Sequence, residues 1–356
     1  MRATPWLIFA LACDRGGKPG PGPGDVAHES ASPHETGAPA DSRRPDSATH
    51  TGEGEGEGEG EGEGEGEGEG EGEVQQNTIR FVALGDAGAA NDTQYEVAAA
   101  MVEVCAARGC DFAVYLGDNF YEDGVESADD DLFQTAFELP YADLDFPFYV
   151  VLGNHDYGGN GLGYEYWKPD FEVTYAETSD KFVLPDNYYS FTEGPADFFG
   201  LDTNAIVWGS GEDQETWLDA AIGASTSPWR VGLGHHPYIS NGDHGNAGNY
   251  EGLSWLPIVN GAEFKTFAED HLCGAVDIYL CGHDHSRQWL EPTCGTEFIV
   301  SGAGAKTTEI VDRDGNPFYF ELGEPGFLWV EMNETTFTGV FYDISGTAEF
   351  ERSFDR

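Results

Sequence analysis

The chain has 356 residues, of which 66 are acidic and 16 are lysine or arginine, so its formal net charge is −50 at pH 7. A Gly-Glu repeat supplies 11 of the acids, and the remaining charge of about −39 still repels phosphate backbones and anionic lipid head groups, which argues against nucleic acids and anionic membrane surfaces as partners. Residues 1–77 show no core-forming pattern, and residues 78–356 are sufficient for one large α/β domain.

Residues 1–12 predict a short signal peptide. One basic residue, Arg2, precedes an apolar run that is too short to span a bilayer. Ala10-Leu-Ala12 before Cys13 fits a small-x-small cleavage site, and it partly fits a bacterial lipobox in which Cys13 would carry a lipid. Two alternatives stay open: a lipoprotein whose only membrane contact is a lipid on Cys13, and a freely secreted protein. Both predict export to an extracellular, periplasmic or cell-surface location.

Residues 13–77 predict a disordered stalk. Residues 16–51 are rich in Pro, Gly, Ser and Ala, and residues 52–73 alternate Gly and Glu without interruption. Neither segment can bury enough apolar surface to offset the entropy of ordering it, and the repeated like charges favour an extended chain.

The folded body is predicted to begin at Thr78 with a βαβ unit: a strand over 79–84, a helix over about 93–107 and a strand over 112–116. A loop rich in glycine and aromatic residues is expected from 157 to 188. Later strands are expected over 189–191, 197–201, 327–330, 337–342 and 348–354, and amphipathic helices over 213–222 and 262–271. This order predicts an α/β fold with two face-packed mixed β-sheets flanked by helices.

Five cysteines lie in the body, and an exported protein tends to pair its cysteines. Cys281 lies within a predicted buried strand, so we expect it to stay free. The simplest pairs are then Cys105 with Cys110, and Cys273 with Cys294.

Polar side chains follow a glycine at the end of five apolar strands. In parallel α/β sheets, the carboxyl ends of the strands form the edge where ligands bind. Five strand ends of the same design therefore predict one site assembled from distant segments. The polar residues at these ends are Asp86, Asp118, Asn154, His235, His283 and His285.

These six side chains offer oxygen and imidazole nitrogen, with no thiolate. A structural zinc site would more often contain cysteine, and a calcium site would need more carboxylates. Six donors are too many for one tetrahedral ion, but they suit two ions about 3.5–4 Å apart that share one carboxylate. Each motif alone has a structural explanation, since Gly-Asp is a common turn. The prediction of a two-metal site therefore depends on their combination.

The order Asp-x-Gly, Gly-Asp-x-x-Tyr, Gly-Asn-His-Asp, Gly-His-x-Pro and Gly-His-x-His resembles the signature of the purple acid phosphatases, which are calcineurin-like metallophosphoesterases. The resemblance is strongest to the small tartrate-resistant type, runs from Ile79 to about Phe350, and includes Ser301-Gly-Ala-Gly304. It implies a four-layer α/β/β/α sandwich. It also implies an acid phosphatase that hydrolyses small phosphomonoesters with a metal-bound hydroxide at a dinuclear centre of Fe(III) and a divalent Fe, Zn or Mn ion.

The resemblance also implies a role for each residue of the site. Asp86, Tyr121 and His285 would bind Fe(III), Asp118 would bridge the two ions, and Asn154, His235 and His283 would bind the divalent ion. His155 and His244 would face the substrate phosphate, although the Gly- and Asn-rich surroundings of His244 depart from the family pattern. His236 stands where the family often has a tyrosine, and it lies outside the implied ligand set.

Two alternative functions stay open. A metallophosphodiesterase that uses Mn, Zn or Fe(II) would have the same scaffold, and Tyr121 is the discriminating residue because such relatives generally lack it. A non-catalytic surface protein that binds metal would fit the stalk and the acidic surface. Such a protein would not need His155 and His244 beside a complete ligand set.

Overall fold

The computed structural model describes residues 77–356 except 258, 309–316 and 322. The predictions of a signal peptide, a lipid on Cys13 and nearly all of the stalk fall on residues 1–76, which lie outside the described residues. Among the described residues, no helix combines the length and the apolar character that a membrane span requires.

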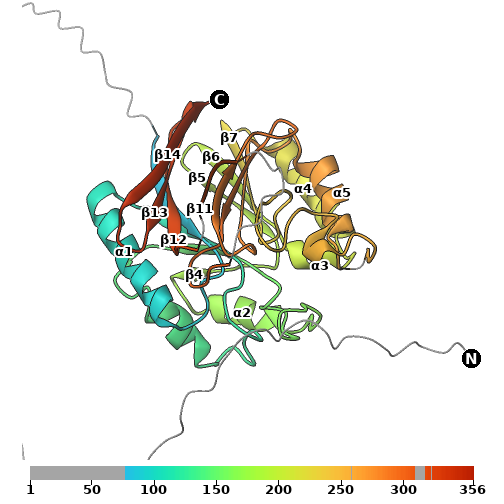
Figure 1. Cartoon of the computed structure of the whole chain (residues 1–356), viewed down its shortest axis with the longest axis horizontal. Helices are drawn as coiled ribbons and strands as arrows, with labels where there is room; N and C mark the ends of the chain where they lie inside the picture. The colour runs from blue at the N-terminus through green and yellow to red at the C-terminus, as the bar shows by residue number, and fades with distance from the viewer. Residues whose placement is uncertain (1–76, 258, 309–316, 322) are drawn as a thin grey trace, which may run out of the picture. The chain divides into compact units, whose positions relative to one another are not determined.

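Two seven-stranded sheets form the centre of the fold (Figure 1). The strands of the first sheet are β1 (Ile79–Leu84), β2 (Phe112–Leu116), β3 (Phe148–Val151), β4 (Phe182–Val183), β12 (Gly326–Met332), β13 (Thr336–Asp343) and β14 (Ala348–Asp355). Those of the second are β5 (Tyr189–Glu193), β6 (Ala196–Gly200), β7 (Trp229–Leu233), β8 (Ile278–Cys281), β9 (Arg287–Leu290), β10 (Glu297–Ser301) and β11 (Pro317–Glu321). Their spatial orders are β14-β13-β12-β1-β2-β3-β4 and β11-β9-β10-β8-β7-β6-β5.

Both sheets are mixed. In the first, β1 to β4 run parallel and β12 to β14 form an antiparallel extension along the free edge of β1. In the second, β6, β7, β8 and β10 run parallel, and β5, β9 and β11 are antiparallel to their neighbours. The parallel strands bring several chain segments to one edge of each sheet.

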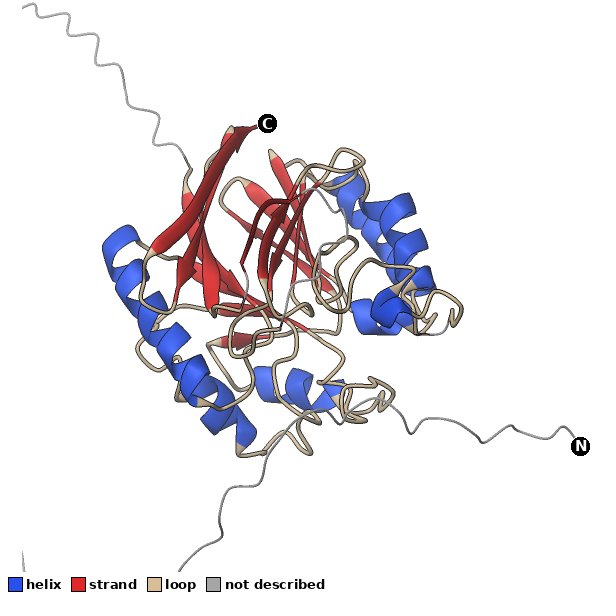
Figure 2. Ribbon diagram, viewed as in Figure 1, coloured by secondary structure: helices blue, strands red, loops and turns tan. Residues whose placement is uncertain are grey.

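Helices cover the outer faces of the two sheets (Figure 2). They are α1 (Asp92–Arg108), α2 (Pro169–Ala176), α3 (Thr203–Val207), α4 (Glu212–Ala224) and α5 (Ala262–Phe267), with π-helical turns at Phe133–Glu138 and Ala268–Leu272 and a 3-10 turn at Tyr250–Gly252. The 17-residue α1 begins where the side chain of Asn91 accepts a hydrogen bond from the backbone N–H of Gln94, and it ends before Gly109, whose φ is +84°.

The strand β1 shows why the layers stack in this order. Apart from the half-buried Arg80, its residues are apolar and buried, as expected for a strand covered on both faces. Phe81 packs in the core between the two sheets, whereas Val82 packs in the core beneath α1, which contributes Val97 and Met101. The two faces of β1 thus pack into two different cores, one between the sheets and one beneath a helix. The predicted four-layer sandwich of two mixed sheets is confirmed.

The segment from 157 to 188 differs from the expected continuous loop, because it contains α2 and β4. Two local signals for a helix were present: Pro169 in its first turn and the acidic residues Asp170 and Glu172 beside it. The helix is only eight residues long, and besides Pro169 its fully buried residue is the carboxylic acid Glu172, whereas apolar residues such as Phe171 and Tyr175 pack on the core only partly buried.

Both predicted disulfides are present. Cys105 pairs with Cys110 at the end of α1, and Cys273 pairs with Cys294. Cys281 is free and buried in β8, as predicted.

Candidate metal centre

The site forms where the carboxyl ends of parallel strands from both sheets meet. The loops after β1, β2 and β3 approach the loops after β7 and β8. All nine residues predicted from the sequence gather there: Asp86, Asp118, Tyr121, Asn154, His155, His235, His244, His283 and His285.

Two glycines permit the close approach of these loops. A Cβ atom on Gly117 would lie 2.6 Å from Nδ1 of His235, and one on Gly282 would lie 2.5 Å from Oδ2 of Asp86. Asp86 and Asp118 themselves have φ angles of +56° and +54°. Non-glycine residues rarely adopt this left-handed conformation, and such strain concentrates at functional sites.

One group of donors consists of Asp86, Tyr121 and His285. The Tyr121 hydroxyl lies 3.1 Å from Oδ1 of Asp86 and 3.2 Å from Nε2 of His285. The same Nε2 lies 3.4 Å from Oδ1 of Asp86. Oδ2 of Asp86 accepts a hydrogen bond from the backbone N–H of His283, which fixes the carboxylate with Oδ1 toward the other two side chains. A carboxylate, a phenol and an imidazole therefore converge.

A second group consists of Asn154, His235 and His283. Nε2 of His235 lies 3.0 Å from Oδ1 of Asn154 and 3.1 Å from Nδ1 of His283. Nδ1 of His235 faces the carbonyl oxygen of Leu116 at 2.9 Å, so the ring proton belongs on Nδ1 and Nε2 keeps its lone pair. Nδ2 of Asn154 donates to the carbonyl oxygen of Gly161, which turns Oδ1 into the cluster.

Asp118 lies between the two groups. Its Oδ1 is 3.3 Å from Nε2 of His235, and Asp86, Asp118 and His285 each offer a donor atom within 4.8 Å of one another. Burial by itself raises the pKa of the Asp118 carboxyl, but attraction to the imidazoles of His235 and His155 in their protonated form, together with a hydrogen bond from the backbone N–H of His155 to Oδ1 at 2.9 Å, holds the pKa well below its usual range. Asp118 is thus an ionised carboxylate within reach of both donor groups.

The chemistry of these side chains fits bound cations. Oδ1 of Asn154, Nε2 of His235 and Oδ1 of Asp118 face one another as acceptors, because the hydrogens of the first two point elsewhere. Lone pairs that face one another in this way repel unless a cation lies between them. Burial, followed by the charges of Asp118 and Asp86, raises the pKa of Tyr121 well above its usual value, so a phenolate here requires a strongly charged metal ion as partner.

His155 borders the cluster on the side of Tyr121. Its Nδ1 lies 2.5 Å from the carbonyl oxygen of Glu122, and its Nε2 lies 4.0 Å from Oδ2 of Asp118. The two rings of His155 and Tyr121 have centroids 4.5 Å apart. The carbonyl of Glu122 therefore holds the Nδ1 edge of the imidazole, and the Nε2 edge faces the cluster of candidate ligands.

His244 borders the cluster on the side of His283. The two rings stack with centroids 4.0 Å apart, and Nδ1 of His244 pairs with the carboxylate of Glu251. Burial lowers the pKa of His244, but the hydrogen bond to Glu251, followed by the charge of Asp284, outweighs burial and raises the pKa to about 9. The imidazole is therefore a cation near neutral pH.

His236 lies behind the cluster. It is buried, its Nδ1 is 2.9 Å from the hydroxyl of Thr203, and its ring centroid is 4.5 Å from that of His283. Its partner is thus a hydroxyl of the protein, which agrees with its omission from the ligand set.

Two carboxylates of the site, Asp156 and Asp284, were not assigned roles from the sequence. Asp156 accepts hydrogen bonds from the backbone N–H groups of Gly153 and Phe120, and so joins the loops that carry Asn154 and Asp118. Asp284 accepts from the backbone N–H of His244 at 2.7 Å and fixes that loop. Both aspartates lie within the motifs already quoted. Their role in joining loops is visible only in the structure, because their partners are 36 and 40 positions away in the sequence.

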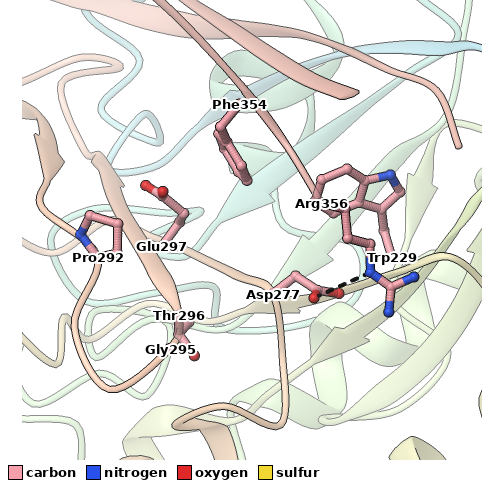
Figure 3. A pocket seen from close by; sticks show the side chains of 8 residues that line it. All are labelled: Trp229, Asp277, Pro292, Gly295, Thr296, Glu297, Phe354 and Arg356. Atoms are coloured by element: carbon pink, nitrogen blue, oxygen red, sulfur yellow. Dashed lines mark ion pairs between the residues drawn. The ribbon is translucent and has the colours of Figure 1, made fainter. Parts of the chain in front are cut away.

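A separate surface pocket lies at the opposite edge of the second sheet (Figure 3). Trp229, Asp277 and Glu297 line it at the amino-terminal ends of β7, β8 and β10, whereas the residues of the candidate metal centre follow the carboxyl ends of strands. Its charged groups pair with neighbours: Asp277 with Arg356, and Glu297 with Arg352. The pocket is therefore distinct from the candidate metal centre.

Comparisons with known proteins agree with this geometry. A family model described as calcineurin-like phosphoesterase matches residues 79–287. The chain is 30% identical over 298 residues to purple acid phosphatase 3 of Arabidopsis thaliana, covering 76% of this chain and 75% of that protein. It is 28% identical over 319 residues to tartrate-resistant acid phosphatase type 5 of Mus musculus, covering 78% of this chain and 91% of that protein.

Among solved structures, a purple acid phosphatase isolated from seeds of yellow lupin (Lupinus luteus) superposes with a TM-score of 0.59 at 17% identity, covering 79% of this chain and 54% of that one. At that identity the likeness shows the fold alone. The predicted relationship to the purple acid phosphatases is confirmed by the sequence matches. Taken with the site, they show that the chain belongs to the calcineurin-like phosphoesterase family and is a hydrolase.

Proposed function

We propose that this chain is an acid phosphatase that hydrolyses small phosphate monoesters at a dinuclear centre of Fe(III) and a divalent Fe, Zn or Mn ion. The observation that supports the proposal most strongly is the Tyr121 hydroxyl, which lies within 3.2 Å of both Asp86 and His285. A phenolate is a hard, strongly donating ligand that favours Fe(III), whereas imidazoles and an amide oxygen suit a divalent ion.

The ligands divide into two sets around one carboxylate. Asp86, Tyr121 and His285 would hold the ferric ion, Asp118 would bridge, and the divalent ion would be held by Asn154, His235 and His283. When bound, the two ions supply Lewis acidity and a water ligand whose pKa is low enough to act as the nucleophile in acid.

His155 and His244 would act on the substrate. Each has its Nδ1 occupied, by the carbonyl of Glu122 and the carboxylate of Glu251 respectively, so each presents Nε2 to a bound phosphate. A protonated imidazole there holds a phosphate oxygen, and it can give its proton to the oxygen of the departing alcohol. The raised pKa of His244 keeps that ring charged under the conditions in which the phosphate binds.

The same placement of Tyr121 supports the iron enzyme over a Mn, Zn or Fe(II) phosphodiesterase. The test compares kcat/KM for an aryl phosphate monoester and the corresponding diaryl diester, between pH 5 and pH 7, with and without chelator. We expect the monoester to be preferred and the chelator to abolish turnover. A preference for the diester would support the phosphodiesterase alternative, and no turnover with two metals bound would support a non-catalytic metal-binding protein.

We also propose that the protein is exported, that its substrates are small phosphomonoesters, that it has no nucleic-acid partner, and that a possible lipid on Cys13 would be its only membrane contact. Two disulfides, Cys105–Cys110 and Cys273–Cys294, support export because such bonds persist in oxidising compartments. Fractionation of cells that produce the full chain, with detection in the medium and the membrane, tests this. Recovery in the reducing cytosol alone would contradict it.

A further inference from the structure

A lysine covers the ring of the candidate iron ligand. Nζ of Lys306 lies 3.4 Å from the centroid of the Tyr121 ring, and the same Nζ forms an ion pair with Oε1 of Glu122 at 2.7 Å. Tyr121 is 8% exposed, so the lysine lies against an almost fully buried phenol. Among the cation–π contacts of the described residues, this is the one that involves a residue of the metal site.

The backbone on both sides of Lys306 is held by segments of the site. The carbonyl oxygen of Ala305 accepts a hydrogen bond from the Asn91 side chain at 3.1 Å, and the backbone N–H of Thr308 donates to the carbonyl oxygen of His285 at 3.0 Å. These two anchors fix the position of the Lys306 backbone relative to a candidate ligand. At the far end of the lysine side chain, the ammonium group is held by Glu122, the residue that follows Tyr121.

Glu122 links the lysine to the rest of the site. Its carbonyl oxygen holds Nδ1 of His155, and its Oε2 lies 3.9 Å from that nitrogen. The ring of Tyr121 thus contacts both the ammonium of Lys306 and the ring of His155. The chain has 66 acidic residues and only 16 lysines and arginines, so a lysine beside the candidate site contrasts with the predominantly negative charge of the protein.

We propose that Lys306 tunes the electron donation of Tyr121 to the metal. This inference rests on the proposed function, in which Tyr121 is a phenolate ligand of Fe(III). A cation over an aromatic face attracts its π-electrons, and the attraction is stronger when the site excludes water. Electrons held on the ring are donated less readily to iron. Lys306 therefore raises the energy of the phenolate-to-iron charge-transfer transition and raises the Fe(III)/Fe(II) reduction potential, as residues beyond the direct ligands commonly do.

The test measures the visible spectrum, the reduction potential and the metal content of the full chain and three variants. Lys306→Met keeps a flexible apolar stem and removes the charge, so the absorption band moves to longer wavelength and the potential falls. Lys306→Arg keeps a cation that can stack on the ring, so both quantities stay close to those of the parent. Glu122→Gln removes the opposing charge, so both quantities change in the direction opposite to Lys306→Met.

The outcomes separate this inference from the proposed function. A coloured parent whose band and potential are unchanged in Lys306→Met, with the same metal content, overturns the tuning role and leaves the iron assignment intact. An equal shift in Lys306→Met and Lys306→Arg also overturns it, because packing and not charge would then be responsible. A colourless parent that binds two Mn or Zn ions overturns the iron assignment and the inference together.

Discussion

Nδ1 of His235 lies 2.9 Å from the carbonyl oxygen of Leu116, although the two residues are 119 positions apart and stand at the ends of strands from different sheets. Leu116 is the last residue of β2, and His235 follows β7. The contact joins the two sheets at the site and fixes the ring proton on Nδ1, so that Nε2 faces Asp118 and Asn154. The packing of the two sheets therefore orients a candidate ligand.

Replacement of His155 tests the distinction between binding metal and binding substrate. We expect His155→Ala to keep both metals and to lose about 10²–10⁴ in kcat, the usual scale for a positioned acid. Metal analysis and steady-state kinetics measure the two effects. His271→Ala is a suitable control, because His271 pairs with Asp219 outside the site. Loss of metal from the His155 variant would show that its assignment to the substrate is wrong.

Replacement of Asp118 should give the opposite pattern. One bridging carboxylate serves both ions, so Asp118→Ala is expected to lose both metals and all metal-dependent activity. Elemental analysis after gel filtration measures the metal-to-protein ratio, and Asp219→Ala serves as the control for removal of an exposed carboxylate. A variant that retained two ions per chain would contradict the bridging role.

Asp202 predicts a specific pH dependence of stability. Burial raises its pKa to about 6, while hydrogen bonds from the Ala205 backbone and the Tyr157 hydroxyl only partly offset burial. Because the folded state holds this proton more tightly than the unfolded chain, the contribution of Asp202 to the free energy of unfolding is fully present below about pH 4. It is lost as the pH rises through about 6, by up to about 3 kcal/mol.

The variant Asp202→Asn removes this titration and keeps a side-chain oxygen that can cap α3. Urea unfolding of both proteins between pH 4 and pH 7 should show the variant becoming progressively more stable relative to the parent. Asp213→Asn, at an exposed position of α4, controls for the loss of one carboxylate. A stability difference that is constant over this range would refute the predicted role of Asp202.

The amino-terminal segment should be dispensable for catalysis. All nine candidate site residues lie between 86 and 285, and the Gly-Glu composition of residues 52–73 offers nothing to pack on the body. A shortened chain that begins at Asn77 is expected to fold and to hydrolyse small phosphate esters at the rate of the full chain. A large fall in kcat/KM on shortening would show that the segment belongs to the enzyme.

The residues that gather at the candidate site could be selected from the sequence because their signal is local. A glycine and a polar residue directly after an apolar strand mark Asp86 and Asp118, and the strand order then brings such ends together. The helix α2 was harder to predict, because it has only eight residues and its buried Glu172 bonds to Asn119, 53 residues away.

The contacts that support the site could also not be predicted from the sequence. Lys306 reaches Glu122 across 184 residues, and its position depends on a loop held by hydrogen bonds to Asn91 and His285. The contact of His244 with Glu251 spans only seven residues, but Glu251 has a φ of +57°, a backbone conformation that its residue type does not predict. Contacts of this kind follow from the tertiary structure.

The metal content and visible spectrum of protein purified without chelator test the central proposal most directly. We predict one iron and one divalent ion per chain and a purple to pink colour from charge transfer between the Tyr121 phenolate and Fe(III). Tyr121→Phe removes the oxygen donor and nearly preserves the ring, so the colour should vanish while iron stays bound and becomes easier to reduce. A colourless parent that is active with two manganese or two zinc ions would contradict the proposal and leave Tyr121 as a neighbour of the site.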